Sequence, residues 1–329
     1  MNAHVPIREM ADFLHSRSNR WKVLALLRAY FDESWFNRSG QITALAGFVA
    51  DAASWDAFEA DWIATWEPFQ TQFGIYTFHM TDCRNGTEKF QRIEQHWRFH
   101  IINAMSQVIG RHKPQPIWSA VIDDDWHKVV GNAPDFLARY PKPLDLCFDH
   151  VVRQMVQWTK RHDFDGGVAP MFAEQTEFQP RMIEAYEAWR KHPQFGQFLR
   201  PVAFASPSQV KPLQSADMLA YGIGLDNMDN SEPLEPWTLA NLGTRRFLHN
   251  ATEHTGLTVG GCYGEAALRN ALISFRETGD KGFCICPNGR AIKRQAPHSN
   301  IRGRPDDRTI KPADTTRDAK GEGARAGVD

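Results

Sequence analysis

Carboxylates stand beside apolar segments at three well-separated places in the chain. Asp32 and Glu33 directly follow the apolar run that begins at Val23. Glu174 follows a second apolar run, and Asp217 lies on a predicted helix whose other residues are typical of a core-packed face. Acidic side chains from two strand ends and one helix are the oxygen ligands that Mg²⁺ or Mn²⁺ prefers. Clustered without a cation or protons, they would repel one another.

Such a cluster suits phosphoryl chemistry. Two divalent ions about 3.5–4 Å apart stabilise the attacking and leaving oxygens of an in-line displacement, with a metal-bound water as the nucleophile. No covalent nucleophile is then needed. The sequence therefore predicts a metal-dependent nuclease that hydrolyses phosphodiester bonds, with Mg²⁺ or Mn²⁺ as cofactor and nucleic acid as partner.

Each candidate residue also has a plainer explanation. Asp32 is equally typical of a hairpin turn, and Glu174 or Asp217 alone is typical of a helix cap or a solvated charge. Asp123, at the end of another apolar strand, competes with Glu174 for the middle ligand position. The sequence leaves that choice open.

Two further residues are candidate substrate contacts. His79 lies three residues before Asp82, although a lone histidine beside a strand end is more often a structural hydrogen-bonding group. Gln214 shares a helix face with Asp217, because the two are three residues apart.

Composition excludes several classes of protein. The 38 Lys and Arg nearly balance the 39 Asp and Glu, so no whole-protein field steers the chain to nucleic acid. The longest stretch without a charged residue is 14 residues, from 68 to 81, which is too short to span a membrane. Neither a secretory signal nor a serine-hydrolase, P-loop or dinucleotide motif is visible. We expect a cytoplasmic protein with reduced thiols.

Apolar runs and helical periodicity alternate along the chain, which predicts an α/β fold with a mixed sheet. A central strand and an antiparallel partner come first. Aromatic residues at helical spacing then predict a helix capped by Ser54, whose tryptophans Trp55, Trp62 and Trp66 face the core. The expected later elements are a strand over 75–78, a helix over 87–110, strands over 116–122, 168–173 and 202–205, and helices over 144–160, 180–190 and from 212 onward.

Several of these features resemble one bacterial family. They are Asp32-Glu33-Ser34 after an apolar strand, a second strand containing Gly47, the helix from Trp55 to Trp66, Phe78-His79 followed by Asp82, and the segment Pro212-Leu213-Gln214-Ser215-Ala216-Asp217-Met218-Leu219-Ala220-Tyr221. Over roughly residues 22–226 the chain resembles the family called domain of unknown function thirty-eight hundred, which is grouped with the ribonuclease H-like superfamily.

The resemblance implies a ribonuclease H-like (RNase H-like) fold, with a mixed five-stranded sheet flanked by helices and an acidic site. Asp32 matches the acid of the first strand and Asp217 that of the late helix, while Glu174 stands where the family often has a strand-end carboxylate. The chain departs from the family at Trp35, where glycine is common, and at Ser215, where an apolar residue is usual. Trp35 is expected to reshape the mouth of the site.

The expected domain organisation has four parts. Residues 1–20 form a polar lead-in, 21–230 the RNase H-like domain with helical insertions, and 231–290 a helical or irregular extension. Residues 291–329 contain nine Lys or Arg, six Asp or Glu and no aromatic residue, which predicts a disordered tail.

Two rival functions remain open at this level. One is a non-catalytic RNase H-like scaffold that binds nucleic acid, a protein partner or a second copy of itself. The other is a metal-dependent phosphohydrolase that acts on small nucleotides.

Overall fold

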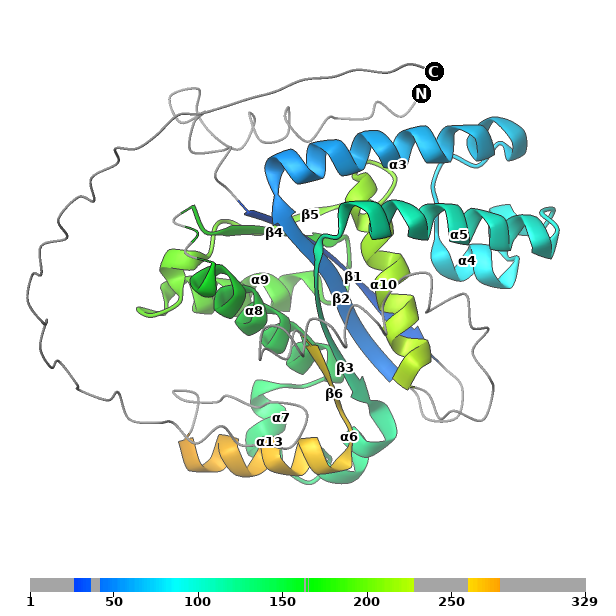
Figure 1. Ribbon diagram of the computed structural model, residues 1–329. Coiled ribbons are helices and arrows are strands. Elements are labelled where there is room, and N and C mark those ends of the chain that lie inside the picture. Colours follow the sequence, from blue (N-terminus) through cyan, green and yellow to red (C-terminus); the bar gives the residue numbers. More distant parts are fainter. Residues whose placement is uncertain (1–26, 37–41, 163, 165, 228–259, 279–329) are drawn as a thin grey trace, which may run out of the picture. The chain divides into compact units, whose positions relative to one another are not determined.

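The computed structural model describes residues 27–36, 42–162, 164, 166–227 and 260–278 (Figure 1). The chain divides into two compact units, residues 1–292 and 293–329, and every described residue belongs to the first. The predicted lead-in and the predicted tail lie outside the described residues. None of the helices within this part of the chain is long and apolar enough to cross a membrane.

A mixed sheet of six strands forms the centre of the unit, in the order β5-β4-β1-β2-β3-β6. The first three strands in sequence form an antiparallel meander, β4 and β5 run parallel to β1, and β6 runs parallel to β3. The prediction of a mixed α/β sheet flanked by helices is confirmed, but the expected number of five strands is wrong. The bounds are β1 (Leu27–Phe36), β2 (Ile42–Asp51), β3 (Gln115–Ile122), β4 (Val168–Ala173), β5 (Ala203–Ala205) and β6 (Gly260–Tyr263).

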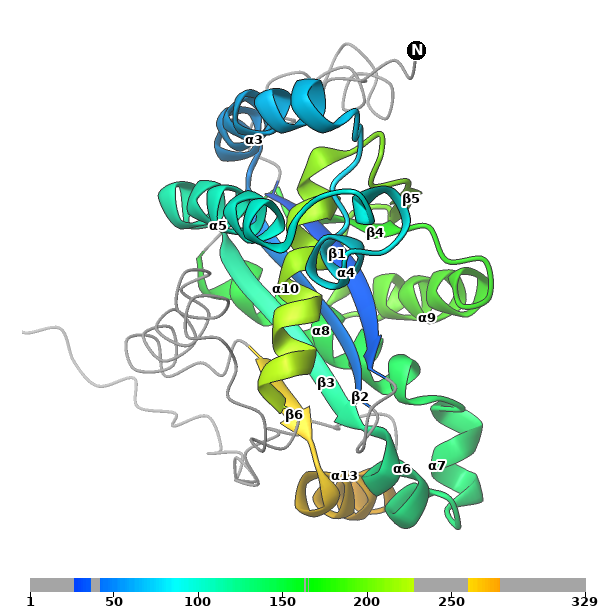
Figure 2. The same cartoon turned by 90° about the vertical axis from the view of Figure 1, so that its right-hand side faces the viewer.

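One face of the sheet is covered by four helices: α3 (Ala52–Phe73), α4 (Met80–Asn85), α5 (Gln95–His112) and α10 (Lys211–Asn227). Figure 2 shows α10 lying across the strands on this face. Trp55, Trp62 and Trp66 of α3 are at most 2% exposed, which confirms that this stripe belongs to the core. A short 3₁₀ turn, η2 (Glu88–Phe90), precedes α5.

The opposite face packs against a second set of helices, and its core is centred on α8. The elements are α6 (Asp123–Val130), α7 (Pro134–Arg139), α8 (Pro143–Arg161), α9 (Gln179–Lys191), η3 (Gly196–Phe198) and α13 (Glu265–Thr278). The C-terminal helix α13 is joined to α6, since the backbone N–H of Glu265 donates to Asp125 and Lys128 pairs with the Glu265 carboxylate.

The pleat of β1 separates its side chains between these two cores. Ala29 and Phe31 face the α8 side, and Tyr30 faces the α10 side. Because side chains alternate along a regular strand, Asp32 joins Tyr30 on the α10 side and Glu33 joins Phe31 on the other. The unbroken register between β1 and β2 holds this alternation through to Phe36.

Three local predictions are wrong. Residues 75–78 form no strand: Ile75 and Phe78 are buried by packing on the α3 side of the core, without a ladder partner. The helix predicted over 87–110 is divided into η2 and α5. Helix α3 is capped by Asp51 and not by Ser54, because the Asp51 carboxylate accepts bonds from both the N–H and the hydroxyl of Ser54, at 2.8 and 2.9 Å.

The extension predicted over 231–290 is described only in part. Within it the structure shows β6 and α13, so this segment contributes a strand to the main sheet as well as a helix. Residues 231–259 and 279–290 lie outside the described residues.

Candidate active site

Asp32 and Asp217, 185 positions apart in the chain, lie close together on the α10 face. Helix α10 packs across β1 and β2 through small and apolar residues, and Ala216 and Ala220 have no exposed surface. Asp32 is 8% exposed and Asp217 4%. Burial raises the pKa of Asp32 well above its usual range, and the charges of Glu33 and Asp217 raise it further. The structure therefore brings together Asp32 and Asp217, the first and the last of the predicted metal-binding carboxylates in the sequence.

Glu33 adds a third carboxyl next to this pair, on the opposite face of β1. Burial raises its pKa from 4.5 to about 8, and the negative charge of Asp217 contributes to the rise. The backbone N–H of Glu33 donates to Asp32 Oδ1 at 2.9 Å, which favours the charged form of Asp32 but does not offset the burial. The charge of Asp217 disfavours ionisation of both Asp32 and Glu33, so the site has excess negative potential.

Helix α4 closes one side of the site. The N–H of Met80 donates to Asp217 Oδ2 at 2.7 Å, and this bond fixes the carboxyl rotamer. Burial raises the pKa of Asp217, and the nearby His79 opposes this rise. The His79 Nδ1 lies 2.9 Å from Asp82 Oδ2, and its side chain is 51% exposed. His79 is therefore near Asp217 and accessible to solvent.

Glu174 lies at the same end of the sheet as Asp32 and Glu33. The parallel register of β1 and β4 runs to Phe31 and Phe172, so Glu174 follows β4 at about the level of Glu33. It is exposed, and its backbone N–H donates to Ala205 O. Its carboxylate therefore lies at the rim, while those of Asp32 and Asp217 are buried.

Asp123 lies farther away. The β-ladders align Asp32 with Ala46 and then with Trp118, so Asp123 is five residues beyond that level. This is about 16 Å along the strands, and the two residues are also separated by two strand spacings. The Asp123 carboxylate accepts a bond from Thr43 Oγ1 at 2.9 Å. The register thus places Glu174 at the level of Glu33, and Asp123 farther along the sheet.

Gln214 anchors the helix that carries Asp217. It has no exposed surface, its Oε1 accepts a bond from Trp62 Nε1 at 3.0 Å, and its Nε2 donates to Pro207 O at 2.7 Å. Both polar ends of the side chain are occupied by the protein itself. Gln214 therefore fixes α10 against α3.

The donor set fits a hard divalent cation in its chemistry. Asp32, Glu33 and Asp217 offer oxygens, and a bound cation would relieve their mutual repulsion. In the described ranges no three His, Cys, Asp or Glu side chains already surround one point as metal ligands do. Mg²⁺ keeps several water ligands in many protein sites, so two protein carboxylates suffice to hold it.

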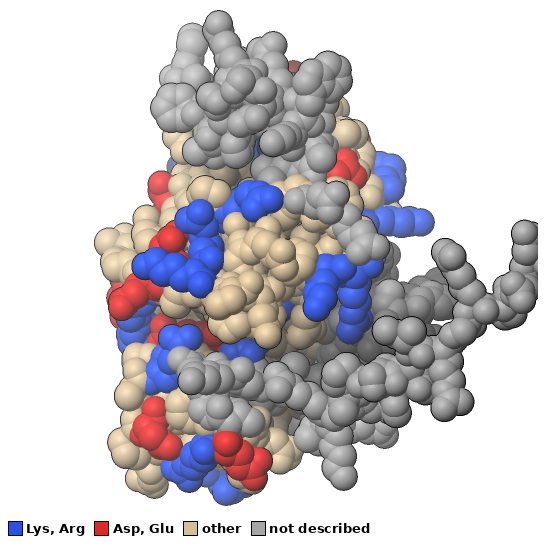
Figure 3. Space-filling view, turned by 90° about the vertical axis from the view of Figure 1, so that its left-hand side faces the viewer, with Lys and Arg blue, Asp and Glu red and all other residues tan. Residues whose placement is uncertain are grey.

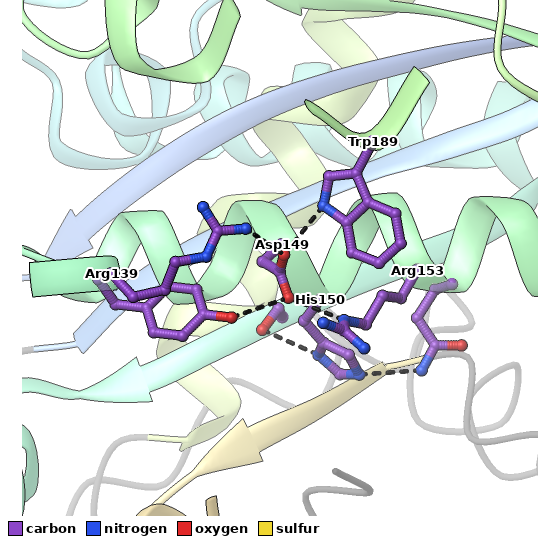
Figure 4. Close-up of polar contacts among 8 residues, drawn as sticks. Arg139, Asp149, His150, Arg153 and Trp189 are labelled. Atoms are coloured by element: carbon purple, nitrogen blue, oxygen red, sulfur yellow. Dashed lines mark hydrogen bonds and ion pairs between the residues drawn. The ribbon is translucent and has the colours of Figure 1, made fainter. Parts of the chain in front are cut away.

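A second buried polar cluster lies on α8, on the other face of the sheet (Figure 4). Asp149, 3% exposed, accepts bonds from Arg153 Nε at 2.8 Å, Trp189 Nε1 at 2.9 Å and Tyr140 Oη at 3.2 Å. The neighbouring His150 is bonded to Ser119 and Gln154, and burial lowers its pKa to about 4. The Asp149 carboxylate is saturated with donors and closed from solvent, which indicates a structural role.

The chain matches no protein-family model, and neither the curated proteins nor the solved structures include a significant match. Its function has to be inferred from the fold and from the carboxylate site.

The raised pKa of Glu33 makes stability depend on pH. Between about 4.5 and 8 the folded protein binds a proton that the unfolded chain releases, so stability is highest below this window and falls as the pH rises through it. We expect Glu33→Gln to stabilise the metal-free protein at pH 8 by about 2 kcal/mol, or roughly 4–8 °C, and to have little effect at pH 4. Thermal melts in chelator from pH 4 to 9 measure the effect.

The matched control is Glu184→Gln, which neutralises an exposed glutamate on α9. Its melting temperature should follow that of the unmodified protein at every pH. A difference between Glu33→Gln and the unmodified protein that stayed constant from pH 4 to 9 would contradict the buried, proton-binding Glu33.

Proposed function

We propose that this protein is a divalent-metal-dependent nuclease that hydrolyses phosphodiester bonds. The observation that carries the proposal is the convergence of Asp32 and Glu33 with Asp217, 185 positions after Asp32 in the chain, whose negative charge raises the pKa of both. Clustered, buried carboxyl groups do not stabilise the fold. Replacing them with apolar residues would make the core more stable. A site for a cation accounts for the cluster.

The fold supports an RNase H-like assignment and membership in the family that the sequence resembles. The first acid lies on the central strand of a mixed sheet, β1, and the last acid lies on a late helix that crosses that strand. The resemblance implies five strands, and β6 is an addition to them. Fold alone does not imply activity, so the site has to carry the functional argument.

The chain's own residues have separate parts in the proposed reaction. Asp32 and Asp217 would hold Mg²⁺ or Mn²⁺, with Glu33 beside them and Glu174 at the rim. When bound, the metal supplies positive charge to the scissile phosphate and lowers the pKa of water. Met80 N–H and the α10 packing keep Asp217 in one rotamer. His79 directs Nδ1 to Asp82, which leaves Nε2 to face a phosphate oxygen or to hold a proton there.

Binding of the substrate would depend on local groups. The formal net charge is −1. Figure 3 shows Lys and Arg at the borders of an uncharged area, with acidic groups among them, on the face that it draws. Because the protein as a whole attracts nucleic acid only weakly, recognition would depend on direct contacts near the carboxylates. Binding should therefore depend only modestly on salt concentration.

The test is a cleavage assay on the purified full chain. Single- and double-stranded DNA, RNA and hybrid oligonucleotides are incubated with Mn²⁺, Mg²⁺ or chelator. We expect cleavage of at least one substrate with metal and none in chelator, together with a metal-dependent rise in melting temperature that is larger at pH 8 than at pH 5. The rise should depend on pH because protons compete with the metal for the carboxylates.

Two results would contradict the proposal. Cleavage that persists in chelator would remove the metal from the reaction. The absence of cleavage and of any metal-induced stabilisation, across all substrates and both metals, would indicate a non-catalytic scaffold.

A further inference from the structure

Arg98 joins helix α5 to the C-terminal end of helix α4. Its Nη1 donates to the backbone carbonyl oxygens of Cys83 and Arg84, at 3.2 and 2.8 Å. The last carbonyls of a helix have no partner within the helix, and an arginine side chain is one of the groups that can satisfy them. In return, the Cys83 thiol donates to Arg98 O at 3.6 Å. Directional bonds therefore tie this end of α4 to α5.

The guanidinium of Arg98 fits closely against the end of α4. Gly86 follows the helix with φ 69°, and a Cβ there would lie 2.6 Å from Arg98 Nη1, so a side chain at this position would displace the guanidinium. Arg98 Nε is buried and makes no hydrogen bond within the described part of the chain. Because a buried N–H without an acceptor is costly, stability alone does not explain this arginine.

The N-terminal end of α4 meets the carboxylate site. The side chain of His79 makes no capping bond, and the N–H of Met80 in the first turn donates instead to Asp217 Oδ2 at 2.7 Å. Met80 and Arg84 are four residues apart, which is about 6 Å along a helix. The Cys83 N–H donates to His79 O, so backbone bonds connect the two ends of this short helix. A displacement of the end that Arg98 holds therefore moves the Met80 N–H.

Apolar packing holds α4 on the core without setting its direction. Met80 and Cys83 have no exposed surface, and Phe78, just before the helix, packs edge-on against two tryptophan rings of α3. Apolar contacts are non-directional, whereas a hydrogen bond requires its donor and acceptor to be aligned. Arg98 therefore supplies a directional restraint on α4, at the end of the helix that is far from Asp217.

We propose that Arg98 is a positioning residue for Asp217. By holding the end of α4, it keeps the Met80 N–H aligned with the Asp217 carboxyl, and so keeps that carboxyl in the orientation that binds a metal ion. A functional metal site tolerates displacements of only about 0.5 Å. Loss of the groups that support a ligand typically weakens metal binding by about 10- to 100-fold. The effect on metal binding rests on the proposed function, whereas the coupling of Arg98 to Asp217 does not.

The first test is amide hydrogen exchange of Met80, measured by NMR on the metal-free full chain with isotope-labelled methionine. Exchange reports local opening, so Arg98→Ala should raise the exchange rate of Met80 by about 10-fold or more. Met105 in α5 and Met218 in α10 have no exposed surface and serve as internal references. Their rates should change by less than about 2-fold. An equal rise at all three amides would show that Arg98 only stabilises the fold, and would overturn the proposal.

The second test is calorimetric titration of the metal-free full chain with Mn²⁺ alone. Arg98→Ala should raise the Kd for Mn²⁺ by about 10-fold. The matched control is Arg111→Ala, which removes another arginine of α5, 50% exposed and paired with Asp61 of α3, and should change neither the Kd nor the exchange of Met80. Arg98→Lys keeps the charge and the alkyl stem but not the planar fork, so it should change both quantities in the same direction as Arg98→Ala. It replaces Arg98→Ala in both tests if the alanine variant does not fold.

The positioning role and the nuclease can fail separately. Unchanged exchange of Met80 in Arg98→Ala, with metal-dependent cleavage by the unmodified protein, would retain the nuclease and reject the positioning role. A selective rise in Met80 exchange in a chain that binds no Mn²⁺ would retain the coupling of Arg98 to Asp217 and reject the metal site. A selective rise in exchange with an unchanged Kd for Mn²⁺ would overturn the claim that this coupling controls metal binding.

Discussion

Asp217→Asn is expected to reduce cleavage by about 10³-fold or more and to make the metal-free protein more stable at pH 8. The loss follows because a carboxylate that holds a divalent cation supplies charge that a neutral amide does not. The gain follows because burial already disfavours the charged form of Asp217, and asparagine resembles the protonated form. An amide oxygen also accepts the bond from Met80 N–H, so the local structure should persist.

Single-turnover cleavage rates and thermal melts of the same preparation measure the two effects. Asp32→Asn should behave in the same way. The control is Asp124→Asn, which neutralises an exposed aspartate on α6 and should change neither quantity. An Asp217→Asn protein that is folded and still cleaves at more than a tenth of the normal rate would remove Asp217 from the active site.

Asp149→Ala is expected to lower the free energy of unfolding by about 3–5 kcal/mol, because it removes the one carboxylate that several buried donors share. Arg153 is 16% exposed by side chain and would lose its carboxylate at 2.8 Å. Trp189 Nε1 and Tyr140 Oη would also lose their acceptor in the core. Chemical denaturation at pH 7 measures the loss, since the linear extrapolation gives the free energy directly.

The control for this prediction is Asp135→Ala, which removes an exposed pair with Arg276 and should have little effect on stability. The folded fraction of Asp149→Ala should still bind metal and cleave, because α8 and the carboxylate site lie on different faces of the sheet. A loss of unfolding free energy below 1 kcal/mol would show that the cluster is hydrated or replaceable.

Much of the α/β frame is predictable because its strands are buried on both faces. Such strands are read as continuous apolar runs, and β3 and β4 were predicted to within one residue of their bounds. The β1–β2 hairpin follows from a polar turn between two such runs. The convergence of Asp32 and Asp217 was predicted from the ligand chemistry of a divalent cation and from the family resemblance.

The sequence was less informative where tertiary packing determines the secondary structure or the strand register. Strand β6 begins with two glycines, which have low strand propensity. A Cβ at Gly260 would lie 2.3 Å from Trp118 Nε1, so glycine is required there for a close approach to β3. At residues 75–78 the error is the reverse, a predicted strand that does not form. A short apolar segment that packs in the core without pairing has the same sequence pattern as a buried strand. The choice between Glu174 and Asp123 depends on strand register, which periodicity does not specify.

The short outermost strands, three residues in β5 and four in β6, have a consequence for behaviour at high concentration. Strand β3 is eight residues long, and without β6 its backbone N–H and C=O groups would be open to pairing with another molecule. Because β6 comes from beyond residue 259, the newly made chain carries this unprotected edge until that segment has been synthesised. We therefore expect β6 to protect this edge of β3 from aggregation, at a stage of synthesis when every carboxylate of the site is already in the chain.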